Sequence, residues 1–166
     1  MPEKRTLERA REDKREGKAP STQAGEFVRE EIEHVRQGKH GVKNTKQAIA
    51  IGLSKARRAG VKLRAPKKGK APARTRKQAK RDLNQGQSAG RKKSGRRSRA
   101  VRGALKKMGR SAASKKNLSR QARAAARKRS SASRRAAAKK AVRTKGPVLL
   151  KREAQKAART RKRKAA

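Results

Sequence analysis

The sequence of 166 residues contains no cysteine, tryptophan or tyrosine, and its single phenylalanine is Phe27. Without cysteine, the chain has no disulfide framework, no zinc–thiolate site and no thiol nucleophile. Large apolar residues are scarce as well, because Leu, Ile, Val and Phe together fill only nineteen positions. A highly charged chain with so few of these residues lies in the compositional range of disordered proteins. The composition therefore predicts that most of the chain is disordered when it is free.

Long apolar runs are also missing, so the sequence offers no candidate for a membrane-spanning helix. The first residues, MPEKRTLERAREDKREGK, lack the apolar centre of a secretory signal and are too acidic for a typical transit peptide. We therefore expect a soluble protein of the cytoplasm. The sequence shows no nucleophile–base pair, no paired catalytic carboxylates and no phosphate-binding loop, so we expect a protein that is not an enzyme.

Positive charge is what the sequence has in excess, since 56 Lys and Arg stand against 11 Asp and Glu, for a net charge of +45. The distribution is uneven: residues 1–36 hold nine acidic and nine basic residues, whereas Asp82 and Glu153 are the only acidic residues that follow. A surplus of this size indicates a polyanionic partner, and nucleic acid is the abundant polyanion inside cells. Anionic lipid is the alternative.

Charge and apolar pattern divide the chain into three segments. Residues 1–18 are predicted to form a charged helix within the net-neutral start of the chain. Residues 19–63 are predicted to form a helical hairpin, and residues 64–166 a Lys/Arg/Ala-rich tail that is disordered or conditionally helical. Leu7 is the only large apolar residue of the first segment, so its helix should be solvent-exposed and frayed. We hypothesise that this helix folds back onto the basic tail and weakens its binding of polyanions.

The first helix of the hairpin lies in the stretch PSTQAGEFVREEIEHVRQG. Ser21 or Thr22 can serve as its N-cap, and Gly38 can end it in the left-handed conformation. Apolar residues recur along this stretch at helical spacing, with Phe27 at the edge of the stripe. The stripe consists of Ala24, Val28, Ile32 and Val35.

The second helix begins at Asn44, a natural N-cap, with Gln47 three residues later as in a capping box. Gly60 and Val61 are typical of a Schellman ending. Small and large residues alternate on its apolar face, which favours close approach of the first helix. The predicted hairpin core consists of Phe27, Val28, Ile32, Val35, Ile49, Leu53, Ala56 and Val61. Because about 40 residues is the lower limit for a core without staples, the hairpin could also form a homodimer through residues 21–63.

The tail contains Ala-rich stretches that favour helix, including one with Pro147 at its first helical position. Repulsion between like charges should keep these helices open until phosphates neutralise them. The predicted fold class is therefore mostly α and disordered. A short two-helix hairpin near the N-terminus is followed by a long low-complexity basic tail with transient helices.

The basic residues of this tail are the candidate DNA-binding site. Proteins that read single strands stack bases on aromatic side chains, and this chain has one phenylalanine. Contacts to the backbone of duplex DNA are therefore favoured, although RNA is not excluded by charge. The predicted DNA-binding residues are Lys55, Arg57, Arg58, Lys62, Arg64, Lys67, Lys68, Lys70, Arg91, Lys92, Lys93, Arg96, Arg97, Arg99, Lys106, Lys107, Arg127, Lys128, Arg129, Arg134, Arg135, Lys139, Lys140, Arg161, Lys162, Arg163 and Lys164.

Two further patterns in the sequence have simpler explanations. A helix-turn-helix would place Lys46, Gln47, Ser54, Lys55 and Arg58 in a DNA groove, but the six-residue loop and the missing third helix argue against it. Glu30 and His34 lie four residues apart and could share a metal ion. Because His40 is the only other histidine, we predict no metal site and no cofactor.

The stretch STQAGEFVREEIEHVRQGKHGVKNTKQAIAIGLSKARRAG resembles a family of small bacterial basic proteins that share a helix of the type KQAIAIGLSKARRAG. The resemblance covers about residues 1–65. Members of that family are labelled as DNA-binding or linker-histone-like, so the resemblance implies the same class of function. It implies no particular functional residues.

Together these patterns predict a non-sequence-specific DNA-binding protein, linker-histone-like and associated with the nucleoid, which neutralises and compacts DNA through its basic tail. An RNA- or ribosome-associated basic protein is one alternative. A partner-binding module of a plasmid-maintenance system is the other.

Overall fold

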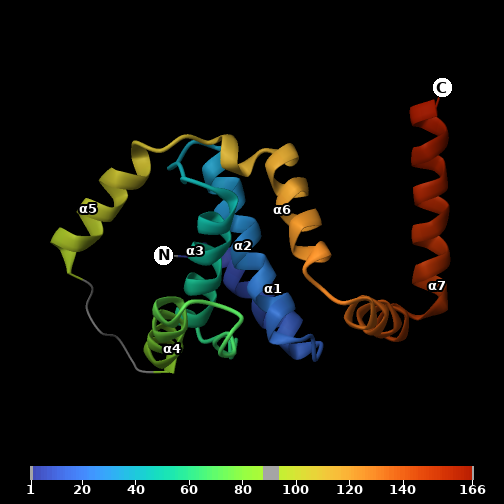
Figure 1. Ribbon diagram of the computed structural model, residues 1–166, viewed down its shortest axis with the longest axis horizontal. Helices are drawn as coiled ribbons and strands as arrows, with labels where there is room; N and C mark the ends of the chain where they lie inside the picture. Colours follow the sequence, from blue (N-terminus) through green and yellow to red (C-terminus); the bar gives the residue numbers. More distant parts are fainter. Residues whose placement is uncertain (1, 88–93, 166) are drawn as a thin grey trace. The chain divides into compact units, whose positions relative to one another are not determined.

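The structure, a computed structural model, describes residues 2–87 and 94–165, and every regular element in these ranges is a helix (Figure 1). The elements are α1 (Lys4–Arg15), α2 (Pro20–Arg36), α3 (Thr45–Arg58), α4 (Ala73–Gln87), α5 (Gly95–Lys106), the 3-10 helix η1 (Ser111–Ala113), α6 (Lys115–Arg127) and α7 (Ser131–Ala165). The chain divides into two compact units, Met1–Gln121 and Ala122–Ala166.

The predicted fold class, a short hairpin followed by a disordered, low-complexity tail with transient helices, is wrong. Helices continue through both described ranges, and α4 and η1 pack against the two helices of the predicted hairpin. The prediction failed because it counted large apolar residues only. Ala, Lys and Arg are strong helix formers, and small residues and hydrogen bonds hold α4 and η1 in place.

The pair of α2 and α3 forms the centre of the first unit (Figure 1). Gly52 of α3 allows the close approach, because a Cβ atom there would lie 2.7 Å from the Cα of Val28. The predicted start of α3 is confirmed: Asn44 Oδ1 accepts from the Gln47 N–H at 2.9 Å, and Gln47 Oε1 accepts from the Lys43 N–H at 2.8 Å. The backbone of Gly60 has a φ of +90°, as the predicted ending requires.

The start and the buried face of α2 differ from the prediction. The helix begins at Pro20, with Ala19 at the N-cap position and no side-chain cap, so neither Ser21 nor Thr22 caps it. Proline is favoured at the first helical position because the helix needs no N–H there. The fully buried line of α2 runs through Ala24, Phe27, Glu31 and Val35, whereas Val28 and Ile32 are half-buried.

Two small clusters make up the apolar core of the first unit. One contains Ala10, Ala24, Phe27, Ala56 and Val61, and the other contains Val35, Val42, Ala48, Ala112 and Ala113. Of the predicted core residues, Phe27, Val35, Ala56 and Val61 are buried, and Val28, Ile32, Ile49 and Leu53 are half-buried. Alanine from α1 and from η1 therefore completes a core that the hairpin alone would leave open.

Helix α1 packs on α2 and is not the frayed, solvated helix that we expected. Thr6, Ala10 and Asp13 are buried, and Leu7 packs against the first core cluster. An ion pair adds to the attachment, since Arg9 lies 3.6 Å from Glu26 of α2. In the loop between the two helices, Lys18 lies 2.8 Å from Asp13. The hypothesis that residues 1–18 fold back onto the basic tail is therefore replaced by a structural role in the first unit.

Helix α4 packs on α3, and the sequence analysis missed it entirely. Ala79 and Asp82 are its buried side chains, with Asp82 only 1% exposed. Asp82 accepts hydrogen bonds from Ser54 Oγ at 2.7 Å and from Arg58 Nε at 2.8 Å. A single carboxylate thus fixes which side of α4 faces the bundle.

Residues 105–113, here called the 105–113 segment, dock on the opposite end of α3 and on the loop before it. The N–H groups of Gly41 and Val42 donate to the carbonyl oxygens of Leu105 and Gly109 at 2.9 and 3.1 Å. Two side-chain hydrogen bonds add to these contacts: Arg36 Nε donates to Ala113 O at 2.9 Å, and Thr45 Oγ1 donates to Ala112 O at 2.7 Å. Ala112 and Ala113 are themselves buried. Backbone hydrogen bonds let this segment dock although it is poor in large apolar residues.

The second unit consists of the last residues of α6 and the whole of α7. Helix α7 contains two helical stretches separated at Gly146, which has a φ of 69° and a ψ of 168°. The second stretch starts at Pro147, which confirms the predicted first helical position. Val142, Val148 and Leu149 are more than half exposed. No helix in the described ranges has both the length and the apolarity that crossing a lipid bilayer requires.

Candidate nucleic-acid interface

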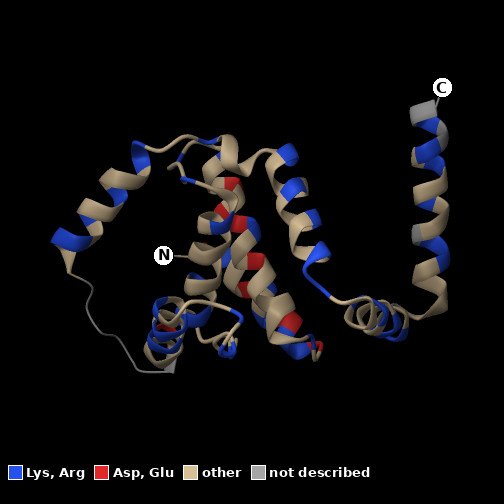
Figure 2. Ribbon diagram, viewed as in Figure 1, with Lys and Arg blue, Asp and Glu red and all other residues tan. Residues whose placement is uncertain are grey.

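Acidic residues lie mainly on α1 and α2, whereas basic residues occur on every α-helix. Figure 2 shows Asp and Glu gathered on α1 and α2, whereas Lys and Arg cover the linker after α3 and helices α4 to α7. From residue 94 to the C-terminus, 28 Lys and Arg accompany one acidic residue, Glu153. The acids of the first unit are largely neutralised by neighbouring bases. Glu26, for example, pairs with Arg9, and Asp13 pairs with Lys18.

Because Asp82 points into the bundle, the outer surface of α4 carries only positive charge. Asp82 is the only acidic residue between positions 37 and 152, and its carboxylate is used by Ser54 and Arg58. Arg74, Lys77, Lys80 and Arg81 are exposed on the same helix. The outward side of α4 therefore carries positive charge with no compensating carboxylate on that helix.

The linker between α3 and α4 continues this charge. Arg57 Nε donates to the Leu63 carbonyl oxygen at 3.1 Å, which ties the start of the linker to α3. The basic residues that follow are exposed. We call the exposed bases of the linker and α4 the 62–81 surface; they are Lys62, Arg64, Lys67, Lys68, Lys70, Arg74, Lys77, Lys80 and Arg81.

Three of the predicted DNA-binding residues take part in contacts inside the first unit. Lys55 Nζ lies 2.7 Å from Glu31 Oε2 and 3.4 Å from Glu30 Oε1. Arg57 is 7% exposed, and burial lowers the pKa of its guanidinium. Arg58 is paired with Asp82 at 2.8 Å. These contacts arise because α2 and α4 cover two sides of α3, and we leave the three residues out of the proposed interface.

The other predicted residues of the described ranges are on the surface. Those with exposed side chains are Lys62, Arg64, Lys67, Lys68, Lys70, Arg96, Arg97, Arg99, Lys106, Lys107, Arg127, Lys128, Arg129, Arg134, Arg135, Lys139, Lys140, Arg161 and Arg163. Arg91, Lys92 and Lys93 lie outside the described residues, as do the side chains of Lys162 and Lys164. Ser94 begins α5 as an N-cap for Arg97, whose N–H it accepts at 3.4 Å.

Sequence reasoning missed two sets of bases. One is the α4 set of the 62–81 surface; the other consists of Lys115, Lys116, Arg120 and Arg123 on α6, which lie beside the predicted Arg127. On α6, the exposed Lys115, Lys116, Arg120, Arg123 and Arg127 fall within an arc of about 140° at 100° per residue. The helical spacing of these bases was a usable signal. For α4, the usable signal was Asp82, a single acidic residue in a basic stretch that lies three residues after Ala79 and so on the same side of a helix.

The packing of α3 argues against the helix-turn-helix alternative. Ser54, Lys55 and Arg58 contact Asp82, Glu31 and Glu30 within the bundle. Gln47 caps the start of its own helix. Three of the five residues that would enter a groove therefore contact other helices of the bundle.

Residues 5–69 match the model of a family described as a family of unknown function (DUF6496). The match runs from α1 through α3 into the linker and ends before α4. Comparison with curated proteins and with solved structures found no match.

Proposed function

We propose that this protein binds duplex DNA through its phosphate backbone, without sequence preference, and compacts it at the nucleoid as a linker-histone-like protein. The observation that supports the proposal most is the inward direction of Asp82, which leaves the outer side of α4 with positive charge alone. The family resemblance drawn from the stretch around KQAIAIGLSKARRAG supports the same class of function. The proposed activity is binding, with no enzymatic step.

The binding chemistry is electrostatic. Duplex DNA presents about one negative charge per 1.7 Å of its axis, and each phosphate that is neutralised releases a condensed counterion. The nine bases of the 62–81 surface match roughly 15 Å of duplex at that density. Because α4 is fixed on α3, its bases are presented without the entropy loss that a flexible segment would suffer on binding.

Compaction requires that one molecule contact more than one stretch of DNA. The 62–81 surface belongs to the first unit, and the exposed bases of α7, such as Arg134, Arg135 and Lys139, belong to the second. Two basic regions on one chain supply the two contacts. Neither needs base recognition, since backbone contacts carry no sequence information.

Duplex DNA is preferred to single-stranded nucleic acid because no aromatic ring is available for base stacking. Phe27 is the only Phe, Tyr or Trp in the sequence, and it is 1% exposed in the core. A homodimer is not part of the proposal. The small size of the hairpin suggested one, but α1, α4 and the 105–113 segment add to its core.

The experiment is a salt titration of binding to a fluorescent 30-bp duplex of mixed sequence, followed by anisotropy with the full chain. The test variant replaces Arg74, Lys77, Lys80 and Arg81 with alanine. The control replaces Lys4, Arg5, Arg11 and Lys14 of α1, which are also exposed, so both variants lose the same charge. The slope of log K against log salt should fall by about 3 in the test variant and by less than 1 in the control.

Equal slopes for the two variants would contradict a role for the 62–81 surface. Two duplexes of unrelated sequence should bind with the same affinity. If a structured RNA displaces the labelled duplex more effectively than unlabelled DNA does, the RNA-associated alternative replaces this proposal.

A further inference from the structure

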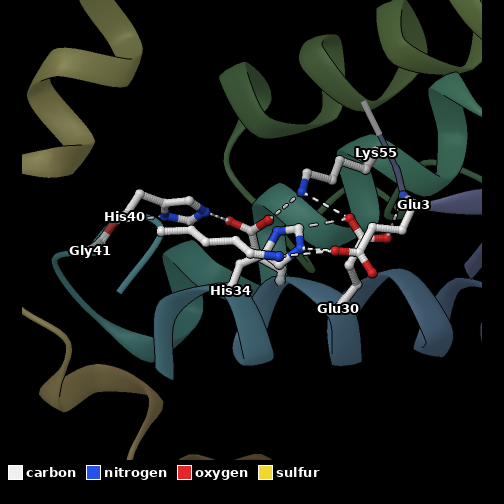
Figure 3. Close-up of polar contacts among 8 residues, drawn as sticks. Glu3, Glu30, His34, His40, Gly41 and Lys55 are labelled. Atoms are coloured by element: carbon white, nitrogen blue, oxygen red, sulfur yellow. Dashed lines mark hydrogen bonds and ion pairs between the residues drawn. The ribbon is translucent and has the colours of Figure 1, made fainter. Parts of the chain in front are cut away.

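A cluster of polar side chains joins Glu3, at the start of α1, to α2, α3 and the loop that follows α2 (Figure 3). Within it, Glu31, His34 and His40 each offer one ligand atom, and these three atoms lie within 4.8 Å of one another. Glu31 is fully buried, and the side chains of His34 and His40 are 13% and 16% exposed. The count of histidines led the sequence analysis to predict no metal site, but the fold gathers both imidazoles beside one carboxylate.

The contacts of His40 leave one ring nitrogen facing a carboxylate. Its Nδ1 lies 3.2 Å from the carbonyl oxygen of Gly41 (Figure 3). A carbonyl can only accept, so Nδ1 carries the proton. In the neutral ring Nε2 is then an acceptor, and it lies 3.2 Å from Glu31 Oε1, another acceptor. A cation between these two atoms would turn a repulsive contact into two ligand bonds.

His34 is oriented in a similar way by Glu3. Its Nε2 lies 2.8 Å from Glu3 Oε1, so Nε2 donates and Nδ1 is left with its lone pair. Glu3 Oε1 also accepts a hydrogen bond from Lys39 Nζ at 3.1 Å, so this carboxylate is held in place beside His34. Metal-binding histidines usually donate their second ring N–H to a carboxylate or a backbone carbonyl. Both histidines of this cluster have such a partner.

Glu31 supplies the third ligand atom. Its Oε2 lies 2.7 Å from Lys55 Nζ, and neither carboxylate oxygen has a hydrogen-bond donor in suitable geometry. A fully buried carboxylate without hydrogen bonds is costly, and a directly bound cation would offset that cost. Lys55 is itself shared with Glu30 at 3.4 Å. With neutral imidazoles, three carboxylates and the ammonium groups of Lys39 and Lys55 leave the cluster with one net negative charge.

We propose that Glu31 Oε1, His34 Nδ1 and His40 Nε2 bind a divalent transition-metal ion, with Zn²⁺ the best match and solvent as the fourth ligand. Two imidazoles and one carboxylate form a ligand set that zinc uses in sites with an open position. Zinc bonds of about 2.0–2.2 Å would need the three atoms to draw slightly closer. The ion would fasten the loop after α2, on which the 105–113 segment docks. This inference does not depend on the proposed DNA binding.

The test uses the full chain, freed of metal by a chelator, and titrates it with Zn²⁺ by calorimetry. Co²⁺ is added in parallel, because a four-coordinate cobalt ion gives strong visible absorption. The variants are His40→Gln and Glu31→Gln, with Glu33→Gln as the control, since Glu33 is an exposed carboxylate on the same helix. Glu3→Gln tests the positioning of His34.

The wild type and Glu33→Gln should bind one Zn²⁺, show the cobalt bands and melt at a higher temperature with zinc. Glu3→Gln should weaken Zn²⁺ binding by about 10- to 100-fold, and His40→Gln should weaken it by more. Circular dichroism establishes that each variant is folded, and His40→Gln keeps the test decisive if Glu31→Gln unfolds. The proposal is overturned if the wild type binds no zinc, in which case a protonated His40 ring would pair with Glu31. It is also overturned if folded His40→Gln binds zinc as well as the wild type does.

Discussion

Arg58 Nε donates a hydrogen bond of 2.8 Å to Oδ1 of Asp82, and this contact joins the end of α3 to α4. Ser54 binds the other carboxylate oxygen at 2.7 Å, and Gln78 of α4 donates to Oδ1 at 3.0 Å. The acidic side chain is thus surrounded by donors from two helices. Both the packing of α4 and the sign of its outer surface depend on this one carboxylate.

Replacing Asp82 with asparagine should lower the free energy of unfolding by about 1–2 kcal/mol, since the buried partner of Arg58 loses its charge. The loss is smaller than for a fully buried pair because the Arg58 side chain is 39% exposed. Urea unfolding followed by circular dichroism measures the change. Arg81→Ala, an exposed neighbour, is the control, and equal midpoints for both variants would show that Asp82 does not hold α4.

Gly41 lies where the loop before α3 meets the 105–113 segment. A Cβ atom there would overlap the carbonyl oxygen of Met108, and the φ of Gly41 is not positive, so alanine would be excluded by this contact alone. Gly41→Ala should therefore destabilise the first unit by about 1–3 kcal/mol. Gly103→Ala in α5 meets nothing within 4 Å and should leave the thermal midpoint unchanged or higher. A Gly41→Ala protein as stable as the wild type would mean that the segment does not dock there.

Lys55 belongs to the DNA-binding residues predicted from the sequence but not to the interface proposed from the structure, so a variant of Lys55 tests which of the two is correct. Lys55→Gln leaves Glu30 and Glu31, 3% and 0% exposed, without their ammonium partner and should cost about 3 kcal/mol of stability. At temperatures where the variant is folded, the salt slope for duplex DNA should equal that of the wild type. Lys77→Gln is the matched control and should have the opposite pattern, with unchanged stability and a shallower slope. A reduced slope for folded Lys55→Gln would return Lys55 to the interface.

The sequence could predict those features that depend on neighbouring residues. The start of α3 at Asn44, its ending at Gly60 and the helix beginning at Pro147 follow from local hydrogen bonding and backbone preference. The segregation of acidic residues into the first 36 positions is likewise visible without a structure.

Only the tertiary structure decided which charges face outward and which are used inside. Asp82 meets Arg58 across 24 positions, Lys55 meets Glu31, and Ala112 and Ala113 complete a core that begins at Val35. The grouping of His40 with Glu31 and His34 also depends on how the loop after α2 folds. The physical reason is that alanine burial and single buried ion pairs leave little trace in composition. Their contribution appears only when distant residues are brought together and removed from water.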